Sequence, residues 1–351
     1  MTTPLPPALL PPPAALVIDG RHQLGSFDGP VPQLNLGDIV QTPGWRGRMA
    51  NWGRDFRTKE WEAFQLGNDE WFVLGAVYNA KVVGIVMVIA VHQASGRRLR
   101  WINKVPARSV EVARGLERSV SRGGSRRSAL TITNALADGR IDLDGHHAGR
   151  NSLPLMSLTG TGLIDEDTRH LAVCHPFPSD RILYTNKVLV PFTGVLSIGE
   201  ETITFDEDRS FLILDDHHGE YPSPQIYDWV TGARHEGGSL LGFNLTRNQA
   251  LNPDVNNENV LWRDGGLHRL PAVTFDRPDG VEGPWHISDR DGLVEVTFTP
   301  EVPSTLHVGP RHSLAEYHAP YGRFQGQITA AGRTTSLDGI FGMGEKKKIR
   351  L

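Results

Sequence analysis

The densest group of side chains that could do acid–base chemistry follows a hydrophobic run at Phe211–Leu214. Two carboxylates, Asp215 and Asp216, and two imidazoles, His217 and His218, come directly after it. Histidine exchanges protons near neutral pH, and a neighbouring carboxylate tunes and orients it. The same residue types bind metals, but this spacing fits no standard metal site. From residue types alone, a solvated loop with charged ends is slightly favoured over a catalytic site.

Strand alternation separates these four side chains into two pairs. In an extended chain, Asp215 and His217 share a face with Phe211 and Ile213, and His218 projects to the opposite side with Asp216. We place the face of the bulkier residues inward. This makes His217 the acid/base and Asp215 its orienting partner, and it predicts that His218 is exposed to solvent.

Further polar residues come later in the chain. Asp228 is a third catalytic candidate, and Asn244 belongs to a run in which amides precede β-branched or apolar residues. Such runs suggest strands that carry polar groups inward, although asparagine is also common in turns. The candidate substrate-binding residues are His218, Tyr221, Tyr227, Trp229, Asn244, Glu258 and Asn259.

Strands are the elements that must position these residues. The chain has 38 glycines and 24 prolines, and turn signals recur every eight to twelve residues, as in a sandwich or barrel. β-Branched and aromatic runs at 70–78 and 82–91 flank a short turn, which predicts a hairpin. Further paired runs are predicted at 128–133 with 140–144, 194–199 with 202–205, 259–262 with 267–270, 285–288 with 293–298, and 322–328 with 334–337.

The best helix candidate is 108–122, in which Arg114, Arg118 and Arg122 recur every fourth residue. It lies in the stretch 97–127, which holds ten basic and two acidic residues. A nucleic-acid site is one interpretation, but aromatic residues are not interleaved through the stretch, whose single aromatic side chain is Trp101. A solvated loop is therefore favoured.

Composition and missing motifs narrow the function. The 351 residues carry a formal charge of −4, which argues against a dedicated nucleic-acid binder. The lone Cys174 excludes a disulfide within the chain and cysteine-based metal sites. The sequence contains no phosphate-binding loop, dinucleotide fingerprint, nucleophile elbow or zinc-protease motif, so we expect no cofactor and no metal.

The proline-rich start resembles no secretory signal, and the longest apolar run is too short for a membrane helix. We therefore expect a cytoplasmic protein without stable membrane insertion.

Several segments, in this order, resemble the domain-of-unknown-function 2804 family from about Phe27 onwards. They are Lys59-Glu60-Trp61, Asn186-Lys187, Leu214–Pro222, Tyr227-Asp228-Trp229, Gly242–Leu245, Asn257-Glu258-Asn259, Asp264-Gly265, Trp285, Phe298–Pro300, Tyr321–Phe324 and Gly342–Glu345. The family is similar, more remotely, to carotenoid 1,2-hydratase and to lipocalin-like Diels–Alderases that form decalins. This resemblance implies two consecutive antiparallel calycin-type barrels, with a hydrophobic ligand cavity at or between them.

Both lines of reasoning predict an all-β protein. We expect a proline-rich arm at 1–26, a lipocalin-like barrel domain at 27–185 and a second at 186–351. The expected function is a cofactor-independent enzyme that hydrates or cyclises a hydrophobic, unsaturated small molecule. The alternative is a non-catalytic carrier of lipids or isoprenoids. No nucleic-acid partner is expected, and the sequence does not fix the oligomeric state.

Overall fold

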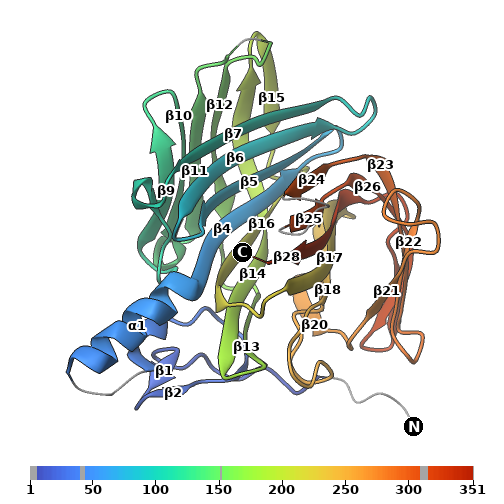
Figure 1. The fold of residues 1–351 in the computed structure, drawn as a ribbon. Coiled ribbons are helices and arrows are strands. Elements are labelled where there is room, and N and C mark those ends of the chain that lie inside the picture. The colour runs from blue at the N-terminus through green and yellow to red at the C-terminus, as the bar shows by residue number, and fades with distance from the viewer. Residues whose placement is uncertain (1–5, 40–43, 151, 309–314, 351) are drawn as a thin grey trace.

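The computed structural model describes residues 6–39, 44–150, 152–308 and 315–350, and these form two large antiparallel sheets (Figure 1). The first sheet curls into a nearly closed barrel and the second into a half-barrel. This confirms the all-β, two-barrel expectation. A separate two-stranded sheet pairs β1 (Val17–Ile18) with β2 (Arg21–His22).

The first sheet has 14 strands and takes in the chain up to residue 220. Its strands are β3 (Gly25–Phe27), β4 (Thr58–Gly67), β5 (Trp71–Asn79), β6 (Val83–His92), β7 (Arg98–Pro106), β8 (Val110–Glu111), β9 (Ser119–Ser125), β10 (Ser128–Ala135), β11 (Arg140–His147), β12 (Met156–Leu163), β13 (His170–Phe177), β14 (Arg181–Ile198), β15 (Glu201–Phe205) and β16 (Phe211–Glu220).

The second sheet has 12 strands and takes in the rest of the chain. Its strands are β17 (Gln225–Glu236), β18 (Ser239–Arg247), β19 (Val260–Arg263), β20 (Gly266–Arg269), β21 (Thr274–Asp276), β22 (Trp285–Ser288), β23 (Val294–Val302), β24 (Thr305–Val308), β25 (Ala315–His318), β26 (Tyr321–Ala330), β27 (Arg333–Ser336) and β28 (Phe341–Ile349).

The predicted strand pairs are confirmed, because each adjacent pair of runs forms an antiparallel ladder. The first of them joins β5 to β6 with Tyr78 opposite Ile85. The others join β10 to β11, β14 to β15, β19 to β20, β22 to β23 and β26 to β27. β-Branched and aromatic runs on either side of short turns were a sufficient signal for these hairpins.

The helix predicted at 108–122 is wrong. The segment forms a 3-10 turn η2 (Ala107–Ser109), then β8 and β9. Glycines explain this outcome: a Cβ on Gly124 would lie 2.2 Å from the Ser128 carbonyl oxygen, so the chain can pair closely with β10 only with glycine there. Tertiary pairing overrides the weak helical spacing.

The one α-helix among the described residues, α1 (Trp45–Arg57), was not predicted. It leads directly into β4 and projects from the end of the first barrel (Figure 1). Two further 3-10 turns are η1 (Leu36–Ile39) and η3 (Leu136–Asp138).

The three largest of five apolar clusters among the described residues fill most of the interior. One, which includes Phe64, Val188 and Leu212, fills the first barrel, and another, which includes Phe243 and Phe298, fills the second. The third joins Ile213 and neighbouring residues of the first sheet to Trp229 and neighbouring residues of the second. The two sheets therefore pack face to face across this third core, which we call the inter-sheet core.

The expected domain boundary at 185/186 falls inside β14, which runs unbroken for 18 residues. Sheet membership changes later, at residues 221–224 between β16 and β17. Part of the expected arm is integrated into the fold, because β3 pairs with β13 and Leu16 is fully buried. The domain division itself stays a prediction.

Candidate active site

Strand β16 is buried on both faces, which decides how its four polar residues are arranged. Odd-numbered residues such as Ile213 join the inter-sheet core, and even-numbered ones such as Leu214 join the core of the first barrel. Asp215 and His217 therefore share one face, as the alternation predicted. The predicted exposure of His218 is wrong: its exposed fraction is 1 %, the same as that of His217, because the barrel closes around the second face.

Facing the second sheet, Asp215 and His217 meet residues of β14. The register places Lys187 opposite Asp215 and Thr185 opposite His217. The Lys187 ammonium donates a hydrogen bond to Asp215 and lies 3.2 Å from His217 Nε2. That ring nitrogen also lies 2.8 Å from Asp215 Oδ1 and 3.0 Å from Thr185 Oγ1.

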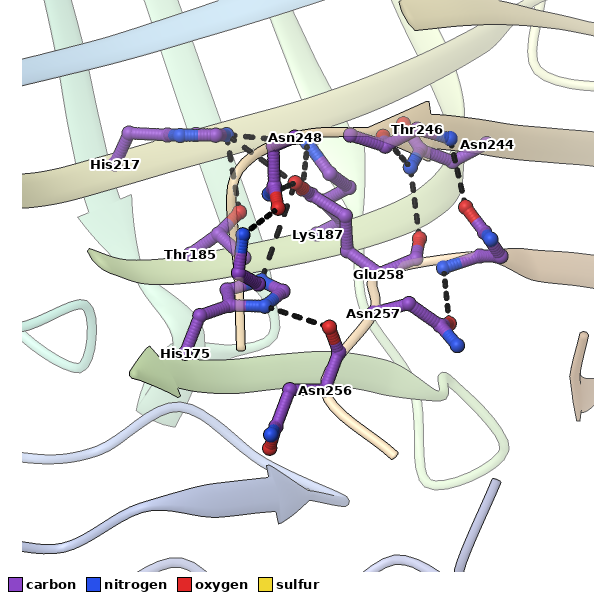
Figure 2. Close-up of polar contacts among 12 residues, drawn as sticks. His175, Thr185, Lys187, His217, Asn244, Thr246, Asn248, Asn256, Asn257 and Glu258 are labelled. Carbon is purple, nitrogen blue, oxygen red and sulfur yellow. Dashed lines mark hydrogen bonds and ion pairs between the residues drawn. The ribbon is translucent and has the colours of Figure 1, made fainter. Parts of the chain in front are cut away.

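A fourth charged residue comes from the second half of the chain. Glu258, in the segment between β18 and β19, is fully buried and places Oε2 3.2 Å from Lys187 Nζ and 3.9 Å from His217 Nε2. Figure 2 shows these side chains converging from the two sheets. We call Lys187, Asp215, His217 and Glu258 the interface cluster.

Aromatic rings hold the His217 imidazole in place. Trp61 of β4 stacks on it with ring centroids 4.5 Å apart and planes 13° apart. The Tyr221 hydroxyl lies 3.4 Å from His217 Nδ1. The Tyr221 ring also stacks on Trp61, with ring centroids 5.7 Å apart. Both ring nitrogens of His217 therefore have partners that could pass or hold a proton.

Opposite charges keep Lys187, Asp215 and Glu258 of the interface cluster ionised despite their burial. Burial disfavours the charged forms, but Asp215 and Glu258 outweigh it and raise the pKa of Lys187. Burial is likewise outweighed at Asp215, where His217 and Lys187 hold the pKa well below its usual range, and at Glu258, whose pKa Lys187 lowers. With one ammonium facing two carboxylates, a proton on His217 would make the group neutral.

Neutral groups surround the charges. Burial lowers the pKa of His175 to about 4, and its Nε2 lies 4.0 Å from Glu258 Oε1. Burial also raises the pKa values of Tyr221 and Tyr227 well above their usual range, with Glu258 adding to the effect. The Tyr227 hydroxyl donates to Glu258 Oε1 at 3.2 Å. These phenols therefore remain hydrogen-bond donors at neutral pH.

The predicted amides support this arrangement. Asn244 accepts a hydrogen bond from the Trp229 indole at 2.5 Å and donates to the Glu258 carbonyl oxygen at 2.8 Å. Asn259 accepts from the Thr246 backbone N–H at 2.6 Å and donates to the Pro271 carbonyl at 2.8 Å. Their contacts fix the course of the segment that carries Glu258, as Figure 2 shows for Asn244.

Asp228 does not lie with the interface cluster. It alternates with Tyr227 and Trp229 on β17 and forms ion pairs with Arg277 at 2.9 Å and Arg247 at 3.6 Å. These contacts match an aspartate that neutralises buried arginine on the other face of the strand.

His218 belongs to a separate group inside the first barrel, which we call the barrel cluster: Glu60, Glu62, Asp216 and His218. His218 Nε2 lies 3.0 Å from Asp216 Oδ1, and Nδ1 lies 3.6 Å from Glu60 Oε1. Burial opposes the imidazolium, but Asp216 and Glu60 raise the pKa of His218 to about 9. Burial and the Asp216 charge raise the pKa of Glu62 to about 8. Glu62 accepts a hydrogen bond from Ser121.

A cavity of about 390 Å³ reaches the interface cluster at Glu258. A small-molecule site is commonly of this size. Its wall mixes amides and charges with apolar side chains, and includes Asn248, Asn257, Arg247, Pro253 and Val273. Asn248 connects the cavity wall to the interface cluster, since its amide nitrogen lies 3.5 Å from Glu258 Oε1.

Within the described ranges, no group of three or more histidine, cysteine, aspartate or glutamate side chains is arranged to hold a metal ion. The helices described there are also too short or too polar to cross a membrane.

Sequence reasoning missed Lys187, Thr185, His175 and Trp61 as members of the site. Lys187 carried a usable signal, because a lysine flanked by Val188–Val190 and Ile182–Tyr184 stands inside a long apolar strand. A lysine there must pair with a buried carboxylate, and Asp215 and Glu258 are the carboxylates it meets.

The comparisons with known proteins agree with this architecture. The family model described as "Domain of unknown function (DUF2804)" matches residues 16–351. None of the curated proteins matches the sequence. Among solved structures, CghA with Sch210972 is similar at a TM-score of 0.51 and 10 % identity, with 84 % of this chain and 88 % of that chain covered. Kievitone hydratase from Nectria haematococca is similar at a TM-score of 0.41 and 11 % identity, with 83 % and 88 % covered. At such identity the likeness to CghA is one of fold.

Proposed function

This chain belongs to the DUF2804 family, and we propose that it is a cofactor-independent enzyme that hydrates or cyclises a small, hydrophobic, unsaturated molecule. The resemblance to carotenoid 1,2-hydratase and the lipocalin-like Diels–Alderases suggested this class. The observation that carries the proposal is the interface cluster, in which Lys187, Asp215 and His217 meet Glu258, the member of the cluster that lines the cavity.

Burying four titratable side chains together is no advantage for stability, because hydrophobic residues in the same positions are often as stable or more stable. Such a group therefore favours a functional role over a purely structural one. Titratable groups with perturbed pKa values beside a cavity are typical of active sites. The cluster also joins two sheets that are distant in sequence, as the site of a two-domain enzyme commonly does.

The geometry suits a proton transfer in which His217 is the acid and Glu258 the base. Asp215 orients the imidazole at 2.8 Å, and the Tyr221 hydroxyl holds its other nitrogen. In a hydration, the proton that Glu258 takes from water would replace the one that His217 gives to the substrate. Glu258, ionised beside Lys187, would stabilise positive charge developing on an unsaturated substrate, or take a proton from attacking water. The donors Lys187 and Tyr227 would polarise a carbonyl and so favour cyclisation.

The proposal is tested by incubating the protein with a panel of polyenes, terpenoids and steroids in heavy-oxygen water and separating products by liquid chromatography–mass spectrometry. Hydration adds one labelled water to the substrate mass, and cyclisation changes retention at constant mass. Conversion of a panel compound is the expected result.

The carrier alternative gives a different result in the same assay. A carrier would bind a panel compound, seen as saturable quenching of tryptophan emission, and return it unchanged. Saturable binding without conversion of any bound compound would contradict the enzyme proposal, and no binding at all would contradict both.

A further inference from the structure

Helix α1 turns its apolar side to solvent. Trp45, Met49, Trp52 and Phe56 recur at spacings of four, three and four residues, which places them on one face of a helix. Their exposed fractions are 65, 57, 65 and 44 %. The Trp52 and Phe56 rings stack on one another at 5.9 Å. We call these four residues the α1 stripe. A surface helix normally buries such a stripe, so this arrangement is inverted.

The opposite side of α1 is the one held by the protein. Arg54 Nε lies 3.6 Å from Glu220 Oε2, and Arg57 Nε lies 2.5 Å from Glu220 Oε1. Glu220 is largely buried at the end of β16. Arg54 comes nine residues, or about two and a half turns, after Trp45, so it lies on the side of the helix opposite the stripe. Charged contacts therefore fix the orientation that leaves the stripe outward, and the helix projects from the barrel end (Figure 1).

The charge of α1 indicates what covers the stripe. Its 13 residues include four arginines, at 46, 48, 54 and 57, against the single acid Asp55, although the whole chain is acidic at −4. Glu220 pairs with Arg54 and Arg57, which leaves Arg46 and Arg48, the sequence neighbours of Trp45 and Met49, to interact with an external partner. Lys59 follows at once, and its ammonium lies 5.6 Å from the Phe56 ring centroid. A short basic helix with an aromatic face is typical of segments that lie in the headgroup region of anionic membranes. Thirteen residues extend only about 20 Å, too short to span a bilayer.

We propose that α1 docks this protein on an anionic lipid surface, with the α1 stripe inserted at the boundary between headgroups and acyl chains. The two arginines of α1 that Glu220 does not hold, Arg46 and Arg48, then contact the phosphates and carboxylates of the headgroups. This goes beyond the proposed reaction and does not depend on it, although a membrane would be a suitable source of an apolar substrate.

Vesicle flotation tests the proposal with the full chain. The probes are vesicles of phosphatidylcholine alone and vesicles of phosphatidylcholine with about one third phosphatidylserine. We expect binding to the anionic vesicles, weakened by salt, and a blue shift of tryptophan emission. The double variant Met49→Ser/Trp52→Ser should lose roughly tenfold or more of this affinity. It should keep the circular dichroism spectrum, because both side chains are exposed.

The matched control is Leu155→Ser/Val195→Ser, which removes the exposed apolar side chains of Leu155, just before β12, and Val195 of β14. It should bind vesicles like the wild type. Wild-type protein that fails to float with anionic vesicles, or floats equally with neutral ones, would overturn the proposal. A stripe that instead contacts a second copy would show as concentration-dependent dimerisation abolished by the double variant.

Discussion

At the scale of single residues, Lys187 is the charge on which the interface cluster depends. It is fully buried between Asp215 and Glu258, and its ammonium is their shared counter-ion. A carboxylate deprived of its buried partner is costly, whereas removing both members of a pair is much less so.

We expect Lys187→Met to lower the free energy of unfolding by about 3–5 kcal/mol. The double variant Lys187→Met/Asp215→Leu should recover part of that loss, because it removes one of the two carboxylates left unpaired. Urea unfolding measures both. Equal stability of Lys187→Met and wild type would mean that the ammonium is not the counter-ion of this cluster.

Residue-level prediction succeeded where strand alternation governs and failed where closure of the barrel matters. The pairing of Asp215 with His217 on one face follows from the period of two along a strand. The burial of His218 could not be inferred, since it depends on β4 and distant strands curling around the other face of β16. The position of Asp228, away from the other catalytic candidates, could not be inferred for a related reason, because its arginine partner Arg277 lies far along the chain.

At the scale of elements, β16 and β4 carry the barrel cluster, which makes stability depend on pH. The folded-state pKa of His218 is raised to about 9 and that of Glu62 to about 8. Both groups thus hold a proton in the folded protein that the unfolded chain releases at lower pH. Their stabilising contributions are complete below the unfolded pKa values and are lost as pH rises through the folded ones.

We therefore expect the urea midpoint to fall between about pH 6 and pH 9. Glu62→Gln keeps the hydrogen-bonding shape without a titratable proton and should flatten this slope, whereas exposed Glu117→Gln should leave it unchanged. A wild-type midpoint that rises over the same interval would contradict the assignment.

In acid, stability changes with pH in the opposite direction. His218 and Lys81 overcome the effect of burial and lower the pKa of Glu60 to about 2, so the stabilising contribution of Glu60 is lost as pH drops.

Local sequence signals identified the hairpins but not α1. Short turn sequences and β-branched runs act within a few residues, so β5–β6 and β10–β11 could be predicted. The α1 segment has two glycines and an apolar stripe that no core covers, and it is oriented by Glu220 more than 160 residues away. The basic stretch 97–127 illustrates the same limit, since Arg97, Arg118 and Arg122 meet acids on other turns and strands.

At the scale of the whole molecule, the two sheets share one interior. The inter-sheet core draws residues from each sheet, and in the interface cluster Glu258, from the segment between β18 and β19, meets three residues of the first sheet. The sequence predicted two barrels divided at 185/186, and this position lies inside β14, whose course depends on long-range pairing with β12, β13 and β16.

This shared interior predicts one cooperative unfolding transition. Urea curves followed by tryptophan fluorescence and by far-ultraviolet circular dichroism should coincide. Two separated transitions would show that each sheet is stable alone and that the inter-sheet core contributes little.

The central claim is that the interface cluster performs acid–base chemistry on a small molecule. The most direct measurement is the kcat of His217→Ala and Glu258→Gln on the panel compound that the wild type converts, with exposed His286→Ala as control. We predict that His217→Ala and Glu258→Gln each lose about 10²–10⁴-fold in kcat, while quenching shows that the compound still binds and His286→Ala keeps wild-type turnover. Full turnover by His217→Ala and Glu258→Gln would contradict the claim.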